Sequence, residues 1–112
     1  PIGCGFEGYL KVFEAMASHM KQWPDSRDVL EMIMEQQMLP CFSRVFSAGL
    51  SRDEFRDVRA RFSATGVFTI KKKLTASKVI DCAMANYTTY SIMSSVYRYV
   101  FVPYVLPMMR RN

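Results

Sequence analysis

The sequence predicts a mainly α protein of four or five helices, with one long C-terminal helix followed by an extended, proline-containing arm. Two observations lead to this prediction. Apolar residues recur at the three-and-four spacing of helices through most of the chain. In addition, the stretch from Lys78 to Arg98 contains neither proline nor glycine. With 112 residues, the chain is expected to form a single domain with one core.

Composition and charge divide the chain into two unlike halves. Half of all residues are hydrophobic, and the net charge is +5. Residues 1–50 carry four basic against six acidic residues, whereas residues 51–112 carry eleven basic against four acidic ones. The basic half, which contains the long predicted helix, is therefore the half expected to meet acidic partners or anionic lipid.

No residue pattern in the chain indicates catalysis or a cofactor. The three cysteines, Cys4, Cys41 and Cys82, are odd in number and far apart, which argues against a disulfide framework and against zinc. His19 is the only histidine and has no metal-ligand spacing around it. We therefore expect a non-enzymatic, intracellular protein without a metal or cofactor.

The first half of the chain predicts three helices. Apolar residues repeat from about Phe6 to Gln22, where Trp23 and Pro24 follow. A second helix is expected from Asp25 or Ser26 to Leu39, because Pro40 disfavours a helical conformation for the residue before it. A short third helix then covers residues 41–48, and Gly49 stands where helices favour a left-handed cap.

The clearest local signal opens the next helix. Ser51 and Glu54 form a capping box, and Gly66 ends the helix that follows. Val67 to Ile70 is the only strand-like run, expected to be an edge strand or an extended segment. A basic patch is predicted along this helix and just after the strand-like run, comprising Arg52, Arg56, Arg59, Lys71, Lys72 and Lys73.

The segment Phe62 to Ile70, between two predicted helices, resembles a shortened EF-hand loop. An EF-hand binds calcium through several oxygen ligands, ending in a bidentate glutamate. This segment contains no carboxylate and is followed by three lysines. The resemblance therefore implies no calcium site.

Residues 75–102 are expected to form the long helix on a helical head of residues 1–74, with residues 103–112 as an extended docking arm. Pro103 and Pro107 argue against helix in the arm. Partner subunits, a membrane and the chain's own core are all compatible surroundings for so apolar a helix, and partner subunits fit best. The predicted partner interface consists of Tyr87, Tyr90, Ser94, Tyr97, Arg98, Tyr104, Leu106 and Met108.

Two functional hypotheses follow. The first is a structural accessory subunit of a larger, membrane-associated complex of the mitochondrial inner-membrane type, which contributes helical packing surfaces to other subunits. The second is a nucleic-acid-associated subunit of a ribonucleoprotein that uses the basic patch. A soluble helical protein-binding module is a third possibility. The first hypothesis is favoured, because the basic residues are few and no RNA- or DNA-binding motif is present.

Overall fold

The computed structural model describes residues 5–110, apart from the side chain of Leu106, and within this range every regular element is a helix. In chain order the elements are α1 (Glu7–Gln22), η2 (Pro24–Ser26), α2 (Arg27–Ala48), α3 (Arg52–Ala64), α4 (Thr75–Ala83), α5 (Tyr87–Val96), η3 (Tyr97–Val105) and α6 (Leu106–Arg110). The last three follow one another without a break and form one long C-terminal helix. The prediction of a mainly α fold is confirmed.

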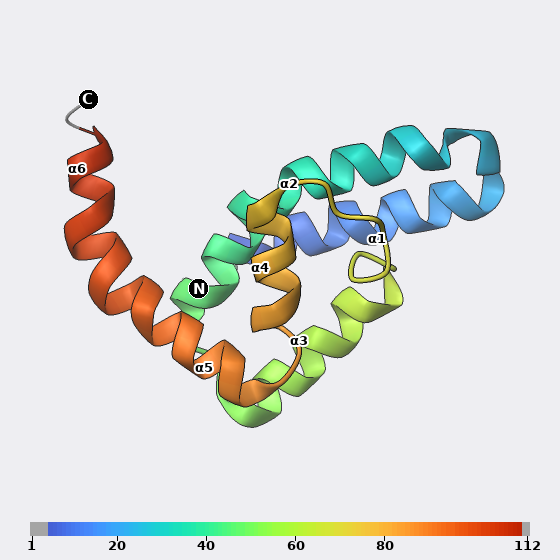
Figure 1. Cartoon of the computed structure of the whole chain (residues 1–112). Coiled ribbons are helices and arrows are strands. Elements are labelled where there is room, and N and C mark those ends of the chain that lie inside the picture. The colour runs from blue at the N-terminus through green and yellow to red at the C-terminus, as the bar shows by residue number, and fades with distance from the viewer. Residues whose placement is uncertain (1–4, 111–112) are drawn as a thin grey trace.

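Helices α1 and α2 form an antiparallel hairpin (Figure 1). α1 has the predicted amphipathic spacing and buries Leu10, Phe13, Met16 and Met20 against its neighbours. The helix ends where predicted, and the Trp23 N–H donates to the His19 carbonyl over 2.8 Å. Pro24 then starts a short 3₁₀ turn that reverses the chain into α2.

Helix α2 lies at the centre of the fold, in contact with α1, α4, α5 and η3. It runs through Pro40 up to Ala48, so the predicted division into two helices at Pro40 is wrong. Pro40 is exposed, on the outer face, while the inner face carries an unbroken apolar stripe at helical spacing. Burial of this stripe outweighs the hydrogen bond that proline cannot make. The stripe comprises Met34, Met38, Cys41, Phe42, Val45 and Phe46.

The connection from α2 to α3 is as predicted. Gly49 has a φ of 59°, the left-handed conformation that favours glycine. Ser51 Oγ accepts from the Glu54 N–H at 3.3 Å, and Glu54 Oε1 accepts from the Ser51 N–H at 2.9 Å. The capping box therefore starts α3, whose residues Phe55 and Phe62 are buried.

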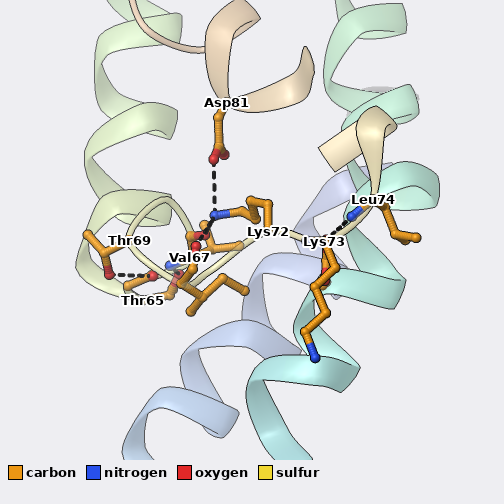
Figure 2. A network of polar contacts seen from close by, with 10 residues as sticks. Thr65, Val67, Thr69, Lys72, Lys73, Leu74 and Asp81 are labelled. Carbon is orange, nitrogen blue, oxygen red and sulfur yellow. Dashed lines mark hydrogen bonds and ion pairs between the residues drawn. The ribbon is translucent and has the colours of Figure 1, made fainter. Parts of the chain in front are cut away.

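Residues 65–74 form a compact turn, not the predicted strand. Gly66 has a φ of 81°, and its carbonyl accepts from the Thr69 N–H over 3.0 Å. The turn places Val67 and Ile70 in the core, which explains their apolar character without any strand pairing. Their backbone carbonyls accept hydrogen bonds from the ammonium group of Lys72. Figure 2 shows Lys72 beside Val67.

The predicted helix over residues 75–102 is interrupted between Ala83 and Tyr87. Asn86 caps the new helix α5: its Oδ1 accepts from the Thr89 N–H at 2.9 Å. The last carbonyls of α4 find partners too, because Arg59 Nε donates to the Met84 carbonyl at 2.7 Å and Thr89 Oγ1 donates to that of Ala83 at 2.9 Å. Satisfied backbone groups on both sides make this corner stable without proline or glycine.

The predicted extended arm is helical as far as Arg110. Pro103 lies inside the π-helix η3, and Pro107 lies in α6, which continues η3 without a break. Arg111 and Asn112 lie outside the described residues. The long C-terminal helix leaves the other helices at an angle, and its far end lies well away from them (Figure 1).

Candidate interaction surface

Two of the residues predicted to contact a partner belong to the chain's own core. Tyr90 is 1% exposed; its hydroxyl donates to the Val45 carbonyl at 2.7 Å and accepts from the Leu50 N–H at 2.9 Å. Burial raises the pKa of this hydroxyl, which therefore stays protonated. Ser94 is equally buried and donates to the Phe46 carbonyl at 2.6 Å. Both side chains attach α5 to the end of α2 and are inaccessible to a partner.

Tyr87 and Tyr97 are half-buried at the edge of this core. The Tyr87 hydroxyl donates to the Leu50 carbonyl at 3.1 Å, and the Arg52 guanidinium lies 4.9 Å from the centre of its ring. The Tyr97 ring lies 6.5 Å from Phe46 and stacks on Phe101 at 5.1 Å. Both tyrosines are therefore mainly used for packing within the chain.

The remaining predicted interface residues lie on a segment that points away from the body. We call residues 96–110 the projecting segment. Its end, α6, contacts no other element than η3. Arg98 is exposed, lies over Gly49 and approaches the Tyr99 ring to 5.2 Å; Tyr104 is 67% and Met108 66% exposed. The side chain of Leu106 lies outside the described residues.

The projecting segment is apolar on every side. Its exposed apolar side chains are at least 40% accessible and include Val96, Tyr99, Val100, Val102, Tyr104, Met108 and Met109. Its only charged residues are Arg98 and Arg110. A helix that is apolar all round is normally buried on all sides. The π-helical stretch is a further indication that this segment is functional, because π-helical turns are rare and are often found at functional sites.

The predicted basic patch is divided among internal contacts. Arg56 pairs with Asp53 at 3.2 Å, Arg52 covers Tyr87, and Arg59 closes the end of α4. The Lys72 side chain is only 5% exposed and lies 3.1 Å from Asp81 (Figure 2). Lys71 and Lys73 remain exposed. Arg52, Arg59 and Lys72 thus contact other parts of the fold, whereas Arg56, whose side chain is 75% exposed, stays accessible together with Lys71 and Lys73.

A notch lies where the C-terminal helix diverges from α2. It encloses about 640 Å³ and is lined by Gly5, Pro40, Ser43, Arg44, Ser47, Ala48 and Tyr97. Sequence reasoning missed all of these residues except Tyr97. The signal was present in the spacing of Pro40, Ser43 and Ser47, which puts small residues on one helical face of α2. The helix end wrongly predicted at Pro40 divided these residues between two helices, so their shared face was not recognised.

Chemically reactive groups are few in the described part of the chain. Burial raises the pKa of the Cys41 thiol to about 12, so this thiol stays neutral, and Cys82 is exposed. Residues 5–110 bring together no group of three side chains able to hold a metal ion. Cys4 lies outside the described residues.

None of the helices formed by the described residues has both the length and the apolar character needed to cross a bilayer. Comparison of the chain with protein-family models, with curated proteins and with solved structures gives no match. The functional argument therefore depends on the surface itself.

Proposed function

We propose that this chain is a non-catalytic accessory subunit that joins a larger protein assembly through its projecting segment. One observation supports the proposal above all: residues 96–110 form a helix in which most of the described large apolar side chains are at least 40% exposed. Monomeric proteins rarely present large contiguous apolar patches unless these patches bind something. Association of the assembly with a membrane stays a prediction.

The size of the apolar surface indicates how strongly the segment could bind. Full burial of a Val, Tyr or Met side chain is worth about 1.5–3 kcal/mol, so burying the exposed parts of these side chains yields on the order of 10 kcal/mol. Association itself costs about 4–15 kcal/mol. The projecting segment alone would therefore give weak binding at best, and a stable complex needs a second contact on the body.

Size-exclusion chromatography with light scattering, without detergent, tests the proposal. We expect the wild-type chain to self-associate as concentration rises, because its apolar segment lacks its partner. Replacing Tyr99, Tyr104 and Met108 by glutamate should give a monomer with unchanged helical circular dichroism. In lysates of cells that produce the tagged chain, the wild type should elute in a large assembly and the triple variant should elute free.

A matched control carries the same three glutamates on the body, in place of the exposed residues Val12, Val29 and Met32. This control should behave like the wild type in both measurements. A wild-type chain that is monomeric at every concentration, and that elutes free from lysates, would refute the accessory-subunit proposal. Association that disappears equally in both variants would show that general apolar exposure is responsible.

A further inference from the structure

The notch beside α2 has the dimensions of a helix-binding site. One wall is the face of α2 with Pro40, Ser43 and Ser47, and the other is the C-terminal helix at Tyr97. A helix with side chains is about 10 Å across, so this half-open notch of about 640 Å³ has room for roughly one and a half turns. Small side chains on the α2 wall allow close approach of a second helix axis.

Among the residues that line the notch, Arg44 is the one that carries a charge. Residues 36–50 contain one charged residue, Arg44, and residues 87–110 contain only Arg98 and Arg110. Arg44 lies over the Tyr9 ring at 5.6 Å and, within the described part of the chain, forms no salt bridge. An occupant with a carboxylate would therefore find an unopposed positive charge in the notch.

This charge distribution distinguishes between possible occupants. A second copy of the chain that inserted its own residues 36–50 or 87–110 would bring only cations to a notch whose charged lining residue is Arg44. Like charges brought together in this way oppose occupation of the notch by these segments of a second copy. A bilayer surface could cover the projecting segment, but a concave notch needs an occupant that enters it. An acidic protein helix meets both requirements.

We propose that the notch receives a helix of a partner protein, with apolar residues against Tyr97 and a carboxylate that pairs with Arg44. This inference rests on the proposed function, since the same partner would surround the projecting segment. It also supplies the second contact on the body that the projecting segment requires for stable binding. The notch then contributes to the choice of partner, because it combines a shape with a charge.

The test selects binders from a phage-displayed library of helical peptides with one randomised face, using the full chain as target. Enriched peptides should carry apolar residues at three-and-four spacing together with Asp or Glu. Two variants, Ser47→Trp to fill the notch and Arg44→Glu to reverse its charge, should each weaken binding at least about tenfold. A peptide with its acid changed to lysine should regain affinity for the Arg44→Glu variant.

Lys11→Glu, which reverses an exposed charge on α1, serves as the control and should leave peptide binding unchanged. The proposal is overturned if no peptide is enriched, if enriched peptides lack acids, or if Ser47→Trp binds them as well as wild type. It is also overturned if the chain forms dimers that Ser47→Trp dissociates, or if only anionic vesicles bind. In each of these cases, loss of assembly in the variant with Tyr99, Tyr104 and Met108 replaced by glutamate would still support the proposal that the projecting segment joins the chain to its assembly.

Discussion

Two tyrosines on the same continuous helix show how differently the body and the projecting segment use apolar residues. Tyr90 is 1% exposed, its hydroxyl makes two hydrogen bonds, and its ring lies 5.8 Å from Phe46 and 5.0 Å from Phe55. Tyr104 is 67% exposed. Both belong to a stretch with few charges, from Tyr87 to Arg110. Hydrophobicity alone therefore does not decide which part of such a helix enters the core.

The difference arises from what surrounds each part. Around Tyr90, one end of α2 and one end of α3 both contact α5. Asn86 caps the start of α5, and the helix runs from there into the space between α2 and α3. From Tyr97 onward, among residues 5–110, η3 contacts only α2 apart from its neighbours along the chain, and α6 contacts η3 alone. The body completes its own core, whereas the projecting segment lacks a covering element. Each of the following variants tests one side of this contrast.

The largest effect is expected for Tyr90→Ala. Removing a fully buried aromatic side chain leaves a cavity and two backbone groups without their partner, so we expect the free energy of unfolding to fall by about 3–5 kcal/mol. Chemical denaturation followed by circular dichroism measures this loss. A loss below about 1 kcal/mol would mean that α5 contributes little to the core, and the contrast with the projecting segment would fail.

Lys72→Met should come next, with a loss of about 3 kcal/mol. The Lys72 ammonium group holds the 65–74 turn through the Val67 and Ile70 carbonyls, at 2.6 and 2.9 Å, and pairs with Asp81. Removing one member of a buried pair costs about 3–5 kcal/mol, and the 29% exposure of Asp81 places this pair at the lower end.

Lys73→Met is the matched control for Lys72→Met, since it removes the same charge one residue away. Its side chain is exposed, and its backbone N–H keeps its hydrogen bond to Glu35. The unfolding free energy of this variant should stay within about 0.5 kcal/mol of wild type. Equal losses of unfolding free energy in the two variants would show that removal of a positive charge from the turn destabilises the fold. The buried position of Lys72 would then not be the cause.

Glu35→Gln tests the second attachment of the same turn and should cost about 1.5–3 kcal/mol at neutral pH. The carboxylate accepts from the Leu74 N–H at 2.9 Å and from the Lys73 N–H at 2.8 Å. The Leu74 hydrogen bond, helped by that of Lys73, lowers the pKa of Glu35 despite the opposing effect of burial. The charged form is therefore the one that stabilises the fold.

The pH dependence of this variant follows from the direction of the shift. A carboxyl whose pKa is lowered on folding contributes fully above its unfolded pKa of about 4.3, and this contribution disappears as the pH falls through the folded pKa. The difference in unfolding free energy between wild type and Glu35→Gln should thus be constant near neutral pH and shrink in acid. The control Asp57→Asn removes an exposed carboxylate on α3. Its free energy of unfolding at neutral pH should differ little from that of wild type.

Much of the body could be predicted from the sequence, because its signals are local. The spacing of α1, the left-handed Gly49 and the Ser51–Glu54 capping box are each set by residues within one helical turn or loop, and all three are confirmed. The errors occurred where tertiary packing overrides a local signal. Burial of the α2 stripe tolerates Pro40, and the turn around Gly66 buries Val67 and Ile70 without strand pairing.

The corner at Asn86 was missed for a different reason. Asn86 and Thr89 form a reciprocal capping box, but in a sequence without proline or glycine nearby this signal is weak. What fixes the corner is the long-range hydrogen bond from Arg59 to the Met84 carbonyl. Because of this corner, Tyr90 and Ser94 face the core and not a partner. The interface prediction therefore included two residues, Tyr90 and Ser94, that are buried in the chain's own core.

The smallest effect on stability is expected for Tyr104→Ala. Because the Tyr104 side chain is mostly exposed, its truncation removes little packing, and the free energy of unfolding should stay within about 0.5 kcal/mol of wild type. The same substitution should lower self-association in light scattering, since it removes part of the apolar surface. The comparison with Tyr90→Ala uses one residue type on one helix, so residue chemistry is held constant. If Tyr104→Ala instead destabilises the chain by more than about 1 kcal/mol, the segment packs on its own body in solution. In that case its apolar surface is already covered and needs no partner, and the contrast between the two regions would not hold.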